Sequence, residues 1–209
     1  MTFLNKPYVI KDFRCFVEQK KTKSFWDAIP KDPYVKEGFR YKTINRYKKS
    51  NGRFVVCPHR PLYQSKIFNP THGDIHRDYE QMKNEPYSIK LLTLRFMELC
   101  CIDEETEVLV QAQRIKTDAK GMLGHPSVEG FHQDGVSYVG VMCIDRKNIM
   151  GGVTQISKTK SDEAVIFSGI LLPGQIVILD DKNVYHYTSP ISVINEEEEG
   201  YRDVLLFGC

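Results

Sequence analysis

The sequence lacks a long apolar run, and no stretch approaches the ~20 apolar residues that a helix needs to cross a bilayer. Its first residues, Met1–Lys6, lack the basic start and the apolar segment of a secretory signal. The six cysteines include no C-x-x-C pair and no spacing typical of a disulfide framework. We therefore expect a soluble cytoplasmic protein in a reducing compartment, with no membrane partner, in which Cys100 and Cys101 are buried free thiols.

An excess of charge of one sign is also missing, because 29 Lys and Arg residues face 27 Asp and Glu residues, for a net charge of +2. A nearly neutral chain gives no electrostatic reason to expect a nucleic-acid partner. Basic residues do gather within residues 1–60, which is compatible with an anionic substrate. The 209 residues, 41% of them apolar, fit a single domain over residues 1–209. The composition does not determine the oligomeric state.

Aromatic residues are abundant, with 11 Phe and 11 Tyr, and they favour a fold rich in strands. Helical spacing predicts a helix within residues 1–30, ended by Pro30, and a second helix over residues 87–101. Apolar stretches separated by Gly and Pro predict strands over residues 38–47, 108–115, 138–144, 153–158, 164–172, 175–179, 184–188 and 201–207. We therefore expect a mainly β (α+β) domain, with helices and strands over residues 1–104 and a jelly-roll, cupin-like core over residues 105–209.

One short stretch carries the strongest chemical signal, Phe131-His132-Gln133-Asp134-Gly135. If it forms a strand, His132 and Asp134 lie two positions apart and point to the same face, where both reach one metal ion. Such a pair is common by chance, but a further histidine, His186, follows in the expected strand over residues 184–188. Two histidines and one carboxylate that leave open positions are typical of non-haem iron(II) oxygenases. The alternative is a surface His-Asp pair with an unrelated strand histidine.

Arg202 is a charged residue at the start of the apolar strand expected over residues 201–207. A 2-oxo acid chelates a metal through its carboxylate and keto oxygens, and if that acid is 2-oxoglutarate, its second carboxylate needs a cation. Arginine binds a carboxylate through two parallel hydrogen bonds and keeps its charge when partly buried. We therefore predict that Arg202 anchors 2-oxoglutarate; the alternative is a salt bridge at a strand edge.

Taken together, these motifs resemble the Fe(II)/2-oxoglutarate-dependent dioxygenases, and in particular the bacterial L-isoleucine hydroxylase group that acts on free amino acids. The similar segments are Gln113-Arg114-Ile115-Lys116, Phe131-His132-Gln133-Asp134, Gly151-Gly152, Val184-Tyr185-His186 with Thr188 and Pro190, and Tyr201-Arg202-Asp203-Val204-Leu205-Leu206. The resemblance implies a double-stranded β-helix that uses iron(II), 2-oxoglutarate and O2. It also implies that His132, Asp134 and His186 bind the iron and that Arg202 anchors 2-oxoglutarate.

The chain departs from this pattern at three places. Gly135 follows Asp134 where the amino-acid hydroxylases carry an acidic residue, and Tyr rather than Phe precedes Arg202. No hydroxyl residue lies two positions after Arg202, so the usual second partner of 2-oxoglutarate must come from elsewhere, and Thr154 is a candidate. These changes leave the iron ligands alone and affect mainly the choice of substrate.

Candidates for substrate binding are Arg40, Arg46, Arg114 and Gln113. A free amino acid presents a carboxylate, and Arg40 is our first candidate to hold it, because Arg40 and Lys42 share one face of an expected strand. We therefore expect hydroxylation of a small molecule, a free L-amino acid. The alternatives are hydroxylation of a protein or peptide side chain and a non-catalytic jelly-roll module that binds a metal. The sequence identifies neither the substrate nor the carbon that is oxidised, nor does it separate hydroxylation from sulfoxidation or desaturation.

Overall fold

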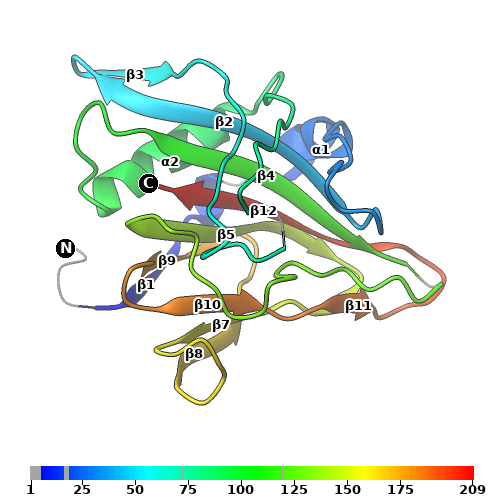
Figure 1. The fold of residues 1–209 in the computed structure, drawn as a ribbon. Coiled ribbons are helices and arrows are strands. Elements are labelled where there is room, and N and C mark those ends of the chain that lie inside the picture. Colours follow the sequence, from blue (N-terminus) through cyan, green and yellow to red (C-terminus); the bar gives the residue numbers. More distant parts are fainter. Residues whose placement is uncertain (1–5, 17–18, 72, 119) are drawn as a thin grey trace.

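The computed structural model describes residues 6–209 apart from residues 17–18, 72 and 119, and strands form most of its regular secondary structure (Figure 1). The helical elements are η1 (Arg14–Phe16), α1 (Gln19–Asp27) and α2 (Tyr87–Leu99). The strands are β1 (Tyr8–Asp12), β2 (Arg40–Ser50), β3 (Arg53–Val56), β4 (Val108–Thr117), β5 (Tyr138–Lys147), β6 (Ile149–Gly151), β7 (Val153–Ser157), β8 (Val165–Ile170), β9 (Gln175–Asp180), β10 (Tyr185–Thr188), β11 (Ile191–Val193) and β12 (Gly200–Gly208).

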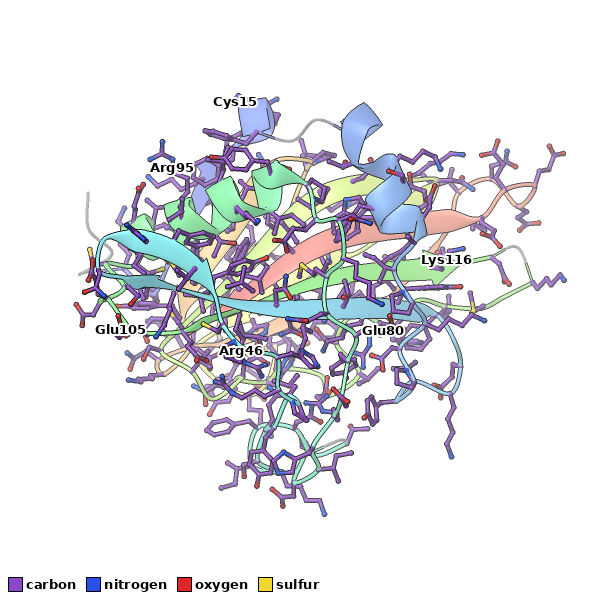
Figure 2. All side chains as sticks on the ribbon, turned by 90° about the horizontal axis from the view of Figure 1, so that it is seen from above. Cys15, Arg46, Glu80, Arg95, Glu105 and Lys116 are labelled. Carbon is purple, nitrogen blue, oxygen red and sulfur yellow. The ribbon has the colours of Figure 1, made fainter. Side chains whose placement is uncertain are left out.

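A large antiparallel sheet forms one layer, with the strand order β1-β9-β5-β12-β4-β2-β3. Two smaller antiparallel sheets, β10-β7-β8 and β11-β6, form the second layer on one side of it (Figure 1). Figure 2, seen from above, shows α1 and α2 along the opposite side of the large sheet. We call the sheet face toward the small sheets the inner face and the face toward the helices the outer face. This is the expected mainly β jelly-roll class, and β1, β2 and β3 from the first half of the chain extend its large sheet.

Each face of the large sheet has its own apolar cluster. On the outer face, Phe96 of α2 stacks on Phe207 of β12 with ring centroids 5.1 Å apart. Gly140 lies beneath this contact, where an added Cβ would come within 3.0 Å of the Phe96 ring. On the inner face, Val141 and Val177 pack in one cluster with Ile156 of the small sheet. The two clusters hold the helices and the second layer against the large sheet through burial of apolar surface.

Most of the elements expected from the sequence are present, with bounds that differ by a few residues. The turn between β2 and β3 has Asn51 and Gly52 at φ of 50° and 70°, the left-handed conformation that a tight hairpin needs. The short strands β1, β6 and β11 were not expected, since three to five residues carry too little periodicity to recognise. The helix expected within residues 1–30 is α1, and residues 17–18 lie outside the described residues.

The six cysteines are free, and Cys100 is buried as expected. The expectation that Cys101 is buried is wrong, because this residue is exposed. It follows Cys100, the last cap residue of α2, and adopts a φ of 50°, the left-handed conformation common just after a helix end. No helix among the described residues is both long and apolar enough to cross a membrane.

Candidate iron and 2-oxoglutarate site

The inner face of the large sheet carries polar side chains where a core would be apolar. The register of β2, β4 and β12 aligns two rows of residues across these strands, Arg40–Ile115–Arg202 and Lys42–Gln113–Val204. All six side chains line one cavity between the layers. Because side chains alternate along a strand, the charged members of both rows point away from the helices and into this cavity.

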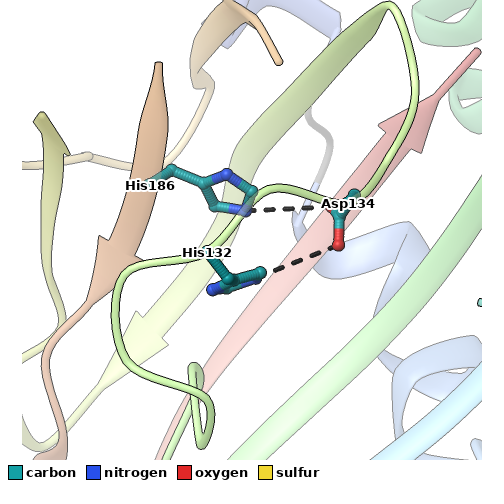
Figure 3. A group of neighbouring side chains, drawn as sticks. All are labelled: His132, Asp134 and His186. Atoms are coloured by element: carbon teal, nitrogen blue, oxygen red, sulfur yellow. Dashed lines mark ion pairs between the residues drawn. The ribbon is translucent and has the colours of Figure 1, made fainter. Parts of the chain in front are cut away.

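His132, Asp134 and His186 meet at one side of the cavity (Figure 3). Nε2 of His132 lies 3.9 Å from Asp134 Oδ1, and Nε2 of His186 lies 3.8 Å from Asp134 Oδ2. The nearest ligand atoms of the three residues all lie within 4.8 Å of one another. The backbones of the two histidines are joined by a pair of hydrogen bonds, with N···O distances of 3.1 and 2.9 Å. The three side chains could therefore hold one metal ion.

The expectation that His132 and Asp134 share the face of a strand is wrong, because only His132 forms an isolated bridge there and Asp134 lies in a loop. The loop is organised by Asp181, whose carboxylate accepts hydrogen bonds from the backbone N–H groups of Asp134, Gly135 and Val136. Gly135 has a φ of 82° and packs against the ring of Phe68, where a Cβ would come within 2.5 Å. This turn, rather than strand alternation, aims Asp134 at the histidines.

The electrostatics of the three side chains suit a metal ligand set. Burial and the neighbouring His132 lower the pKa of His186 to about 3, so this imidazole is neutral near pH 7 and keeps a lone pair for a metal. Burial favours the neutral form of Asp134, but His186 and His132 outweigh it and lower the pKa of this carboxyl. Nδ1 of His132 lies 2.8 Å from the Gly130 carbonyl, which orients the ring with Nε2 toward Asp134.

Arg202 lies deep in the same cavity and is 1% exposed. Its Nε and one terminal nitrogen have no hydrogen-bond partner. Gly152 lies beside it, since a Cβ there would be in van der Waals contact with Arg202 Cδ at 3.4 Å. A buried guanidinium with free donors is costly without an anion, so the cavity has a built position for a carboxylate.

Thr154 lies on β7 directly opposite Thr188 of β10. Thr188 lines the cavity, whereas Thr154 does not. The Thr154 hydroxyl is buried and has no hydrogen-bond partner. It is therefore a polar group that a ligand in this part of the jelly roll can satisfy.

The four candidates for substrate binding divide into two pairs. Arg40 and Gln113 line the cavity, although Nε of Arg40 already donates to Asp32 Oδ2 at 2.7 Å. Arg46 and Arg114 do not line it. Arg46 donates to the backbone carbonyls of Arg60 and Pro61, and Figure 2 shows it beside β2. Arg114 points to the outer face, where it pairs with Asp203 and Asp27. We therefore remove Arg46 and Arg114 from the candidate site.

Among the cavity residues that the sequence analysis did not name as candidates are Lys42, Gln64 and Arg77. Gln64 and Arg77 lie on the loop that joins β3 to α2, where no periodic pattern marks the residues that face inward. Gln64 Nε2 donates to Asp134 Oδ1 at 3.2 Å, and its Oε1 accepts from Arg77. For Lys42 a signal was present, because it alternates with Arg40 along β2.

A jelly roll that holds two histidines, one carboxylate and a buried arginine in one cavity defines the class of non-haem iron(II) oxygenases. Residues 23–208 match the model of the 2OG-Fe dioxygenase family, and the chain belongs to this family. It is therefore an Fe(II)- and 2-oxoglutarate-dependent dioxygenase that uses O2, and the residues described above fit both the metal and the co-substrate.

Solved structures support the fold. A bsmA homologue from Methylobium petroleophilum PM1 matches with a TM-score of 0.77 and 22% identity, over 98% of this chain and 88% of that one. IDO from Bacillus thuringiensis matches with a TM-score of 0.74 and 17% identity, over 99% and 91%. The Fe(II)/α-ketoglutarate-dependent dioxygenase TqaL matches with a TM-score of 0.69 and 15% identity, over 97% and 82%. Among curated proteins, no sequence matches the chain.

Proposed function

We propose that this dioxygenase hydroxylates a free L-amino acid and releases succinate and CO2. The supporting observation is the lining of the cavity, where four cationic side chains, Arg40, Lys42, Arg77 and Arg202, accompany two carboxylates, Glu129 and Asp134. A zwitterion with one carboxylate and one ammonium suits a lining that has cations in excess and one carboxylate, Glu129, that does not belong to the His132–Asp134–His186 group.

In this proposal His132, Asp134 and His186 hold the iron. The donor set is that of the non-haem iron(II) oxygenases, and it covers only one side of an ion. When bound, iron(II) supplies the redox chemistry in which O2 oxidises 2-oxoglutarate to succinate and CO2 and gives its second oxygen atom to a C–H bond. The hydrogen bond from Asp134 N–H to Asp181 and the contact of His132 with the Gly130 carbonyl keep the ligand atoms aimed at one point.

Arg202 anchors the distal carboxylate of 2-oxoglutarate with the two nitrogens that have no protein partner. The Thr154 hydroxyl is a second donor for the same ligand, in place of the hydroxyl residue that is missing two positions after Arg202. The apolar part of the lining, which includes Val139, Val141 and Leu206, borders the co-substrate and excludes water from it. The cavity thus orients two small acids beside one metal, and orientation of this kind can supply several kcal/mol of the rate enhancement.

The proposal is tested with the iron-loaded enzyme, 2-oxoglutarate, ascorbate and each of the twenty proteinogenic L-amino acids. Succinate release identifies the amino acids that stimulate turnover, and product mass shows whether 16 Da were added, the mass of one oxygen atom. We expect stimulation by one or a few amino acids that is insensitive to salt. If product is found only on protein or peptide, and activity falls steeply as the salt concentration rises, the proposed amino-acid substrate is wrong, while the 2-oxoglutarate-dependent reaction is unaffected.

A further inference from the structure

Besides Arg202, two of the four cations in the cavity have no carboxylate partner among the described residues. Lys42 is 4% exposed, and its Nζ lies 4.2 Å from the centre of the Tyr79 ring without an ion pair. Arg77 is 2% exposed; one terminal nitrogen donates to Gln64, and Nε has no partner. Arg40, by contrast, is neutralised by Asp32. The cation that we expected to hold a substrate carboxylate is therefore already occupied, and its two neighbours are not.

Lys42 and Arg77 approach the cavity from different elements. Lys42 belongs to β2 of the large sheet. Arg77 closes a loop whose ends are joined by two hydrogen bonds of 2.8 Å between Leu62 and Arg77. Burial lowers the pKa of Lys42, the charges of Arg40 and Arg77 lower it further, and the carboxylates of Asp32 and Asp134 offset this only in part. A cation buried beside other cations is unfavourable unless an anion joins them, so the pair has the chemistry of an anion site.

This position is separate from the one at Arg202. Lys42 and Arg202 lie in different rows of the inner face, and β4 separates their strands. Two strand spacings of ~4.8 Å place the strands about 10 Å apart. One small dicarboxylate at Arg202 and the iron therefore leaves Lys42 and Arg77 for a second acid.

We infer that Lys42 and Arg77 together bind the α-carboxylate of the substrate and thereby select carboxylate-bearing molecules, an inference that rests on the proposed function. Gln64 joins this position to the iron site, because its amide donates to Asp134 and accepts from Arg77. A substrate carboxylate at Arg77 is thus one side chain away from the proposed iron ligand. The two cations fix one end of the substrate, and the rest of the molecule extends toward His132 and His186.

The test uses the enzyme loaded with iron(II) and 2-oxoglutarate without oxygen, and binding is measured by calorimetry. The probes are the twenty L-amino acids, their α-amides, which lack the carboxylate, and the matching carboxylic acids without the amine. The variants are Lys42→Met and Arg77→Gln. Lys48→Met and Arg95→Gln are matched controls, since these residues pair with Glu105 and Glu98 at the surface.

We expect the wild type to bind at least one amino acid at least tenfold more tightly than its amide. Both variants should bind that amino acid at least tenfold more weakly and its amide as the wild type does, while the controls are unchanged. If the two residues had a merely structural role, the variants would bind the amino acid and its amide equally weakly and would also bind 2-oxoglutarate more weakly.

The remaining outcomes separate the two proposals. Amino-acid affinity within twofold of the wild type in both variants would overturn the role of Lys42 and Arg77 and leave the proposed function intact. Binding of the acids without the amine but of no amino acid, lost in both variants, would support the carboxylate site and overturn the amino-acid substrate. If no carboxylate probe binds the wild type, the inference is overturned as well.

Discussion

Arg202 and Asp203 are consecutive residues of β12 that point to opposite faces of the large sheet, and their surroundings differ sharply. On the outer face, Asp203 accepts two hydrogen bonds of 2.7 Å from Arg114, and Arg114 also donates to Asp27. The Arg114 guanidinium lies 4.4 Å from the centre of the Tyr201 ring. On the inner face, Arg202 is as deeply buried but keeps two nitrogens without a partner.

This difference separates two uses of a buried arginine. The charge of Arg114 is neutralised by carboxylates of the protein, so loss of Arg114 lowers the stability of the fold. The charge of Arg202 has no carboxylate partner among the described residues, so an anionic ligand is needed to neutralise it. Burial alone therefore does not identify a binding residue in this sheet, whereas the supply of partners does.

The largest expected effect is the loss of iron and turnover when His132 or His186 is replaced. His132→Ala or His186→Ala removes one of the three proposed iron ligands, and we expect loss of most bound iron and all succinate release. Iron content measured after reconstitution checks this, with His59→Ala as the control because His59 pairs with Asp78 away from the cavity. Full iron content in both variants would show that the ligands are other residues.

On the outer face, Arg114→Ala should lower the free energy of unfolding by about 3–5 kcal/mol, because it leaves the buried Asp203 carboxylate unpaired. Denaturant unfolding measures this, and Arg95→Ala, which breaks only an exposed pair with Glu98, should change stability by less than about 1 kcal/mol. Equal stability of the two variants would mean that the outer cluster does not support the fold.

A smaller effect is expected at Thr154. Thr154→Val keeps the shape and removes the buried hydroxyl that has no protein partner. If this hydroxyl binds 2-oxoglutarate, the affinity for the co-substrate falls roughly two- to tenfold, the range for one hydrogen bond. Calorimetric titration of the iron-loaded protein checks this, and an affinity equal to the wild type would exclude Thr154 from the site.

The smallest effect is expected for the stability of Lys42→Met without ligands. The buried Lys42 has no ion pair to lose, so the free energy of unfolding of the Lys42→Met variant should stay within about 1 kcal/mol of the wild-type value or rise. Denaturant unfolding beside Lys48→Met measures this. A clear drop would place Lys42 with Arg114, among the charges that the fold itself requires.

The regular strands could be predicted well from the sequence, and so could the shared face of Arg40 and Lys42. Arg114 is the exception, because it was a candidate beside Gln113 although neighbouring residues of a strand point to opposite faces. Arg40 and Lys42 share the inner face as the alternation along β2 indicates, and Arg202 follows the same rule on β12. These inferences succeed because a strand has a fixed period of two.

The ion-pair partners of the buried arginines could not be predicted from the sequence. Nothing near Arg114 in the chain indicates that Asp203, 89 positions later, neutralises it, or that Asp32 does the same for Arg40. These pairings depend on strand register and loop paths. The site at His132 and Asp134 shows the same limit, because the right residues meet through a turn organised by Asp181 rather than along a strand.

The most direct test of the account is the affinity of the iron-loaded Arg202→Ala variant for 2-oxoglutarate, measured without oxygen and compared with the wild type. Loss of a charge-assisted contact to a carboxylate costs about 1.5–3 kcal/mol, so we predict an affinity that is roughly ten- to hundredfold weaker, with iron content unchanged. The same measurement on Arg114→Ala, in buffer where that variant stays folded, should give the wild-type affinity. An unchanged affinity in Arg202→Ala, or an equal loss in both variants, would contradict the assignment of the inner arginine to the co-substrate.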